Sequence, residues 1–361
     1  MKKRIFAVSL LSTLMLAACG GGGGGSAGSS NPGAPVGSNP APTPAPTPEP
    51  VAQTALQTSV PAPSYQAGST TLSAFMTLNA ARQAYGIGLR AQHEKIDVAA
   101  QNHAKYMLYH WGVGDFANAA HQEDKIKPGF TGEGVTQRMA FAGYYAGPAG
   151  EALSIAIEVD GVKSDPGVFA IDGLLAAPYH RFGLLDSTRD VGLADASGRF
   201  PGEGGVNHMF VVNYGTRDGV PAQLPATNWF GMWPVPDAVE VNFAFSGETP
   251  DPIPVNKGAC AGYPVSFQVH TSLALTVSAF TLVESLSGAP ISVQLSTPQI
   301  DANPIQARHN TAYIIPYRPL KLGTKYTARF VGTSGPTAID KTWSFTTEAK
   351  NTRMMRGCTP G

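Results

Sequence analysis

The sequence is poor in charge and in cysteine, and both shortages exclude classes of protein. Charged residues make up 14% of the 361 residues, whereas roughly 25% is usual in soluble domains. The 25 basic and 25 acidic side chains balance, and no basic stripe could gather phosphates, which argues against nucleic-acid binding. Three cysteines without a C-x-x-C pair exclude a disulfide-dense miniprotein, a zinc finger and a thioredoxin-type site.

The common catalytic motifs are also missing. Outside the glycine-rich segment near the N-terminus there is no G-x-S-x-G elbow, H-E-x-x-H helix, P-loop or G-x-G-x-x-G turn. Cys260 and Cys358 do not lie beside a histidine-rich stretch, so a cysteine nucleophile is not expected. The 41 glycines and 30 prolines, about a fifth of the chain, indicate loops, linkers and β-structure rather than a helical bundle.

The N-terminus has the composition of a secretory signal peptide. Residues 2–4 are basic, and residues 5–18 form an apolar run of about fourteen residues, too short to span a bilayer. The run ends in Leu-Ala-Ala-Cys-Gly at residues 16–20, which resembles the lipobox of bacterial lipoproteins. The resemblance implies that Cys19 becomes the lipidated first mature residue, carrying acyl chains such as palmitate. An ordinary signal peptide cut after Ala18 is the alternative.

A low-complexity segment follows the predicted lipobox over residues 20–65. It is a glycine run, then Ser, Asn and Pro, then the Ala-Pro-Thr-Pro repeat of residues 41–48. Glycine runs are flexible and proline-rich runs favour extended polyproline II, and neither buries enough apolar surface to offset its ordering entropy. We expect a disordered tether that holds the folded part away from a membrane.

Two folded regions of different character are predicted after the tether. Residues 66–222 carry helical periodicity near 72–85 and 92–110, followed by strand-like stretches such as 152–159 and 208–214. Helices that precede and flank short strands are typical of an α–β–α layered domain.

Residues 223–361 change to a period of two. Apolar residues alternate along 239–245, which indicates an antiparallel β-sandwich. The pattern of residues 320–330 and 341–347 resembles bacterial Ig-like domains of secreted proteins, and that resemblance covers roughly 230–348. The predicted fold class is therefore α+β, an α–β–α sandwich followed by an all-β Ig-like sandwich.

Three short pieces of the first region carry histidine and carboxylate side chains. They are Ala-His-Gln-Glu at 120–123, Ala-Gly-Glu-Ala at 149–152 and Ala-Pro-Tyr-His-Arg at 177–181. Their order resembles the SCP-like, bacterial branch of the CAP superfamily of cysteine-rich secretory, antigen 5 and pathogenesis-related proteins. The resemblance covers about residues 72–216. It implies an α–β–α sandwich whose cleft gathers two histidines and one or two acidic residues.

Residue by residue, the resemblance points to His121, Glu151 and His180 as the cleft residues. The sequence departs from the family at Ala152, where Asn is usual, and at Tyr179, where Gly is usual. The first change removes an amide that could orient Glu151 and weakens a catalytic reading.

Four further residues are secondary candidates. Glu123 could supply a second carboxylate, and His208 could lie at the cleft rim. Arg181 fits a bracing role better than substrate binding. His103 shares the apolar face of its helix, which favours a buried, hydrogen-bonded role.

Two imidazoles and a carboxylate suit more than one chemistry. As three ligands with an open position they would hold zinc or a similar divalent ion. Without metal, the same histidines could carry protons near neutral pH. Each histidine could also be a hydrogen-bonded structural residue. The sequence itself therefore leaves the cofactor open.

The expected function is a non-enzymatic binding or interaction module for lipid, another small molecule or a surface protein. A metal-assisted hydrolase using His121, Glu151 and His180 is the first alternative, and an adhesin-like role of the Ig-like region is the second. The lipobox implies an outer-membrane lipoprotein, because Gly20 rather than Asp follows Cys19, and leaves open whether it is periplasmic or exposed at the surface.

A disulfide between Cys260 and Cys358 is predicted. Once Cys19 carries lipid, these are the only thiols left, and an exported protein meets an oxidising compartment. Cys260 precedes a predicted strand and Cys358 lies beyond the last one, so the bridge would hold the C-terminal tail against the domain.

The lipobox makes a direct prediction for localisation. Cys19→Ser should move the protein from the membrane to the soluble fraction, because the variant cannot carry the lipid anchor. Fractionation and intact-mass measurement check this. A variant that stays membrane-bound with the mass of the wild type, apart from the substitution, would show that Cys19 is not lipidated.

Overall fold

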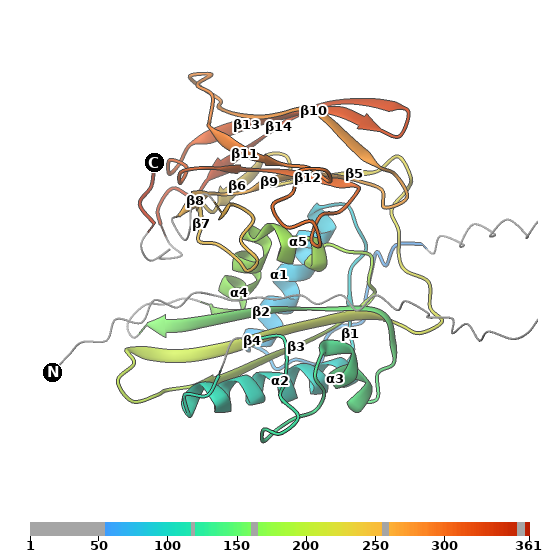
Figure 1. Cartoon of the computed structure of the whole chain (residues 1–361), viewed down its shortest axis with the longest axis vertical. Coiled ribbons are helices and arrows are strands. Elements are labelled where there is room, and N and C mark those ends of the chain that lie inside the picture. Colours follow the sequence, from blue (N-terminus) through green and yellow to red (C-terminus); the bar gives the residue numbers. More distant parts are fainter. Residues whose placement is uncertain (1–54, 117–119, 160–164, 255–259, 352–357) are drawn as a thin grey trace, which may run out of the picture. The chain divides into compact units, whose positions relative to one another are not determined.

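The computed structural model describes residues 55–116, 120–159, 165–254, 260–351 and 358–361 (Figure 1). The predicted signal peptide, the lipidation site Cys19 and most of the predicted tether lie outside these residues. All described residues belong to one compact unit. None of the described helices is long and apolar enough to cross a membrane.

The first part of the described chain forms one four-stranded sheet with helices packed against it. Its strand order is β1-β3-β4-β2, parallel between β1 and β3 and antiparallel elsewhere. In chain order the elements are α1 (Thr70–Ala84), β1 (Ala91–Gln92), α2 (Glu94–Gly112), α3 (Val135–Phe141), β2 (Ala146–Val159), α4 (Pro166–Ala176), α5 (Pro178–Leu184), β3 (Asp190–Gly198) and β4 (Gly205–Arg217).

Local sequence explains where the longer helices start and which face they bury. Ser69 Oγ accepts a hydrogen bond from the N–H of Leu72 at the start of α1, and Asp165 accepts from Gly167 at the start of α4. Buried residues of α2 recur at a spacing of three or four, as the sequence predicts: Ile96, Ala99, Ala100, His103, Ala104 and Met107.

Alternate residues of β4 belong to two different hydrophobic clusters. Phe210 and Val212 pack in a cluster with residues of α1 and α4, whereas Met209 and Val211 pack in a cluster with residues of α2. Figure 1 shows α2 running along the sheet formed by β2, β3 and β4. Because successive side chains of a strand point to opposite faces, β4 is buried on both.

Residues 55–65, predicted as the end of the tether, lie against this region. Gln57 and Leu89 exchange hydrogen bonds, from Gln57 Nε2 to Leu89 O (2.9 Å) and from Leu89 N to Gln57 O (2.8 Å). Tyr65 OH donates to Asp97 (2.5 Å). Ordered structure therefore begins before residue 66.

The second part of the described chain, from residue 223 to the C-terminus and called the β-region below, is built from strands and loops and has no described α-helix. One sheet has the order β10-β13-β14-β6, a second β11-β12-β9-β5, and β7 and β8 form a separate pair. The strands are β5 (Phe230–Trp233), β6 (Ala238–Val241), β7 (Ala244–Phe245), β8 (Ala261–Gly262), β9 (Val265–Val269), β10 (Leu275–Glu284), β11 (Val293–Ser296), β12 (Thr311–Pro316), β13 (Lys325–Ser334) and β14 (Thr337–Thr347).

The predicted fold class, an α–β–α sandwich followed by an all-β Ig-like sandwich, is wrong. Of the described residues 34% are in strands and 21% in five helices, and the strands are spread over four sheets. The 14 residues of β2 span about 46 Å at 3.3 Å per residue, whereas the seven residues each of α3 and α5 span only about 10 Å.

The predicted antiparallel pairing and the period of two also fail at residues 239–245. Glu240, inside β6, has a φ of 55°, and the register of β6 with β14 shifts at this point. The stretch is not one strand, because β6 ends at Val241 and β7 begins at Ala244. Val239 is 71% exposed although the alternation placed it inside. In addition, β6 pairs with β14 in parallel.

The predicted bridge between Cys260 and Cys358 is confirmed. The two sulfur atoms are bonded, and the Cα atoms lie 5.4 Å apart. Cys358 is buried and belongs to the core cluster that also contains Phe267, Phe330 and Phe345. The bridge ties the C-terminal end of the chain to Cys260, which directly precedes β8.

Removing this bridge should destabilise the β-region. It closes a loop across 98 residues of sequence, for which chain entropy gives an upper figure of about 4–5 kcal/mol. Cys260→Ser with Cys358→Ser should therefore lower the free energy of unfolding measured with guanidinium. An unchanged denaturation midpoint, or two reactive thiols in denatured, unreduced wild-type protein, would contradict the prediction.

Candidate functional site

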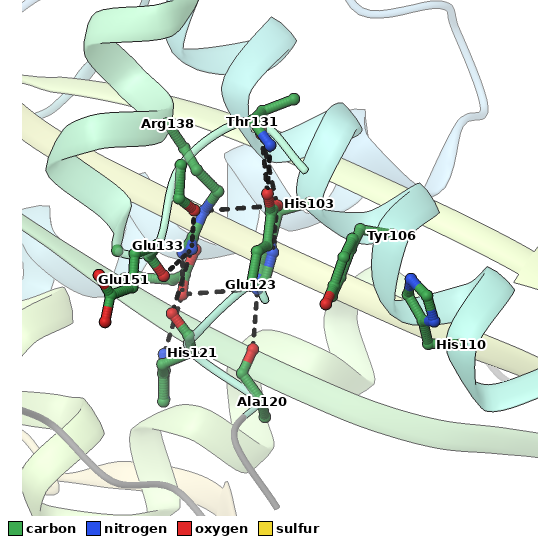
Figure 2. Close-up of polar contacts among 12 residues, drawn as sticks. His103, Tyr106, His110, Ala120, His121, Glu123, Thr131, Glu133, Arg138 and Glu151 are labelled. Atoms are coloured by element: carbon green, nitrogen blue, oxygen red, sulfur yellow. Dashed lines mark hydrogen bonds and ion pairs between the residues drawn. The ribbon is translucent and has the colours of Figure 1, made fainter. Parts of the chain in front are cut away.

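A buried ion pair joins α3 to β2. Arg138 of α3 donates from Nη2 to both carboxylate oxygens of Glu151 on β2, at 2.8 and 2.7 Å (Figure 2). Its Nη1 donates to the backbone oxygens of His121 and Glu133, both at 3.1 Å. Arg138 and Glu151 are 0% and 5% exposed. One guanidinium therefore fixes the strand, the short helix and the loop that precedes it.

The same carboxylate orients His121. The His121 Nδ1 lies 2.9 Å from Glu151 Oε1. An ionised carboxylate can only accept, so the proton sits on Nδ1 and Nε2 keeps a lone pair. His121 Nε2 is buried and has no hydrogen-bond partner among the described residues. The side chain is 10% exposed, so the imidazole lies just beneath the surface.

His180 of α5 shows the same arrangement with a different carboxylate. Its Nδ1 lies 2.7 Å from Oε2 of Glu248, a residue that follows β7. Its Nε2 is also buried without a partner in the described part of the chain. The centroids of the His121 and His180 rings are 6.5 Å apart with an interplanar angle of 28°. Two imidazoles, each held through Nδ1, thus lie side by side.

His103 and Glu123 form a fully engaged neighbouring pair. The His103 Nδ1 lies 2.9 Å from Glu123, and its Nε2 lies 2.8 Å from the backbone oxygen of Ala120. Glu123 also accepts from the N–H of Thr131 at 2.6 Å. Burial would raise the pKa of Glu123, but the bonds from His103 and Thr131 outweigh it and lower that pKa. Neither ring nitrogen of His103 is free for a ligand.

Charge and burial act oppositely on Glu151 and His121. Burial alone would raise the pKa of Glu151, but the charges of Arg138 and His103 and the bond to His121 hold that pKa well below its usual range. For His121, burial lowers the pKa and outweighs the opposing effect of Glu151. At neutral pH, Glu151 is therefore ionised and His121 is neutral.

The predicted zinc set of His121, Glu151 and His180 does not fit this geometry. The three side chains do come together, but the guanidinium of Arg138 engages both oxygens of Glu151. A positive group thus stands where a cation would be coordinated. Within the described ranges, no group of three or more His, Cys, Asp or Glu side chains could hold a metal ion.

His208 lies elsewhere on the sheet. It pairs in register with Ala156 of β2, five residues from Glu151, or about 17 Å along the strand. The His208 Nδ1 lies 2.8 Å from Asp195, and Nε2 lies 3.3 Å from Glu158. The bond with Asp195 raises the pKa of His208. His208 is not part of the His121 and His180 cluster.

Arg181 braces α5 against the β-region. Its Nε donates to the backbone oxygen of Leu175 (2.6 Å), and its Nη1 and Nη2 donate to Ser266 Oγ and Pro264 O, both at 3.0 Å. The side chain is 1% exposed. These contacts match the bracing role expected from the sequence.

Glu248 is the residue of this site that the sequence did not reveal. It lies in the predicted Ig-like region, in a Ser-Gly-Glu-Thr-Pro stretch at 246–250 that carries no site motif. Its position beside His180 depends on packing between segments about seventy residues apart. No local pattern could have found it.

Two pockets are lined by residues of α2 and of the segment that follows it, and neither includes the paired imidazoles. One has a volume of about 610 Å³ and the other about 410 Å³, and both are lined by Tyr106 and Phe130. Glu123 lines the larger one, but His121 and His180 line neither. The imidazole pair is therefore a buried cluster distinct from these pockets.

No protein-family model matches this chain, and no curated protein matches it. Its function must be argued from the residues and their geometry.

The buried ion pair predicts a large effect of Arg138→Ala on stability. Removing the guanidinium leaves the Glu151 carboxylate buried without its main partner, which costs about 3–5 kcal/mol of unfolding free energy. Arg329→Ala is the control, because Arg329 donates from Nε and Nη2 to both oxygens of Asp340 in an exposed ion pair, and it should cost far less. Equal losses in chemical denaturation would contradict this ranking.

Proposed function

We propose that this protein is a non-enzymatic binding module of the cell envelope that recognises its ligand through Nε2 of His121 and His180. The observation that carries the proposal is the pair of buried Nε2 atoms without partners in the described chain. Each imidazole is fixed through Nδ1 by its own carboxylate, so Nε2 is the ring nitrogen left to accept a hydrogen bond from a ligand.

The chemistry of the pair defines the ligand group. In the neutral form of each ring the proton is on Nδ1, facing the carboxylate, and Nε2 is then a hydrogen-bond acceptor. A buried acceptor without a partner costs about 1–3 kcal/mol, and a ligand that donates N–H or O–H groups would recover this energy. We infer a small ammonium, amine or hydroxyl group, such as a lipid headgroup presents.

The cellular setting is part of the same proposal. The lipobox residues and Cys19 support an outer-membrane lipoprotein, periplasmic or exposed at the surface. A lipid-anchored binding module meets lipid headgroups and other envelope molecules directly. The order of His121, Glu151 and His180 supports a relationship to the CAP superfamily at the level of these residues.

The metal-assisted hydrolase is less well supported. It needs Glu151 as a ligand or a base, yet Arg138 engages both of its oxygens and the pKa of Glu151 is lowered. For an adhesin-like role of the β-region, the site offers no specific support.

A pair of lipids that differ only in their donors tests the proposal. Short-chain phosphatidylethanolamine carries N–H donors, whereas the matching phosphatidylcholine is fully N-methylated. Titration followed by NMR should show binding of the first and at least about tenfold weaker binding of the second. His121→Ala and His180→Ala should each weaken binding of the first lipid similarly.

His309→Ala is the control for these variants, because His309 is an exposed histidine of the β-region. It should bind phosphatidylethanolamine like the wild type. Equal binding of the two lipids, or wild-type binding by His121→Ala, would show that the imidazole pair does not recognise the donor group.

A further inference from the structure

Glu248 links the β-region to Tyr179 and His180 through three hydrogen bonds. Its Oε1 accepts from the N–H of Tyr179 at 3.0 Å. Its Oε2 accepts from the N–H of His180 at 3.2 Å and from the His180 Nδ1 at 2.7 Å. Glu248 is 5% exposed and follows β7, whereas Tyr179 and His180 belong to the first turn of α5.

These bonds satisfy groups that α5 cannot satisfy by itself. The first N–H groups of a helix have no partner inside the helix, and α5 has no side-chain cap from the residue before it. The Glu248 carboxylate takes that place and complements the positive end of the helix. The same carboxylate requires the proton of His180 to sit on Nδ1.

The surrounding contacts hold α5 firmly against the β-region. Tyr179 OH donates to Asp301 at 2.6 Å, and Tyr313 OH donates to the same carboxylate at 2.7 Å. Phe182 packs in one hydrophobic cluster with residues of β7, β8 and β12. The position of Glu248 relative to His180 is therefore set by an extensive packed interface.

We propose that the β-region is part of the ligand site, with Glu248 as a positioning residue that fixes the tautomer of His180. Through Glu248, the β-region makes His180 Nε2 a hydrogen-bond acceptor like His121 Nε2. The role of this tautomer in ligand binding rests on the proposed function, but the tautomer itself can be measured without any ligand. It assigns to the β-region a role beyond that of a spacer or an adhesin.

The test is the protonation of the His180 ring nitrogens in the full mature chain, read from long-range ¹H–¹⁵N NMR spectra. Wild type should show the proton on Nδ1. Glu248→Ala should shift the population towards the Nε2–H form, because Nδ1–H loses its acceptor. Glu248→Met is a second variant of similar length that keeps the packing and cannot accept a hydrogen bond, so it decides the question if the alanine variant does not fold.

Asp301→Asn is the matched control, because it alters a carboxylate of the same interface that does not contact His180. It should leave the His180 tautomer as in the wild type. A His180 that keeps Nδ1–H in a folded Glu248 variant, or one that shifts equally in Asp301→Asn, would overturn the inference.

Ligand binding then separates this inference from the proposed function. Both Glu248 variants should bind short-chain phosphatidylethanolamine about tenfold more weakly than wild type. If the tautomer shifts as expected while wild type binds no phosphatidylethanolamine, the proposed ligand is wrong and the role of Glu248 stands.

Discussion

The site depends on the ion pair between Arg138 and Glu151. Taking both charges out of water is costly, and the pair is favourable only because its geometry is bidentate and further acceptors use the remaining guanidinium hydrogens. Those further acceptors are backbone oxygens of the loop that carries His121. The ion pair thus places the imidazole, and its carboxylate then orients the ring.

Electrostatics and burial together make the site a pair of hydrogen-bond acceptors. Arg138 keeps Glu151 ionised, so the carboxylate accepts from Nδ1 of His121, and burial keeps the imidazole neutral. Glu248 does for His180 what Glu151 does for His121. The result is two lone pairs on adjacent rings in a place with little water, where a hydrogen bond from a ligand gains more than it would at the surface.

The same geometry argues against metal coordination by these residues. A zinc site needs three donors that converge on one point. Here one of the three predicted donors is already neutralised by a guanidinium, and the carboxylates serve the Nδ1 atoms rather than a shared ion. Of His103, His121 and His180, only His121 and His180 have a ring nitrogen without a hydrogen-bond partner in the described chain. Two such nitrogens are too few for a three-ligand zinc site.

Local pattern predicted some parts of this structure well. The buried face of α2 follows from apolar spacing along the helix, and the bridge between Cys260 and Cys358 follows from elimination and redox compartment. The order of three short pieces in the sequence singled out His121, Glu151 and His180, which the fold brings together.

Features set by long-range pairing could not be predicted in this way. The length of β2 comes from its ladder with β4 rather than from its own composition, so the extent of strand was underestimated. A positive φ at Glu240 makes β6 irregular, and what the alternation indicates as one strand is two, β6 and β7. Glu248 reaches His180 only through packing between distant segments, which leaves no trace in local sequence.

The most direct measurement of the central claim is an NMR pH titration of the His121 side chain in the full mature chain. The account predicts a titration midpoint below the value of about 6.5 for an unperturbed histidine, and a neutral ring that carries its proton on Nδ1. A midpoint at or above that value, or a neutral ring with the proton on Nε2, would contradict the claim that His121 offers a free acceptor nitrogen at neutral pH.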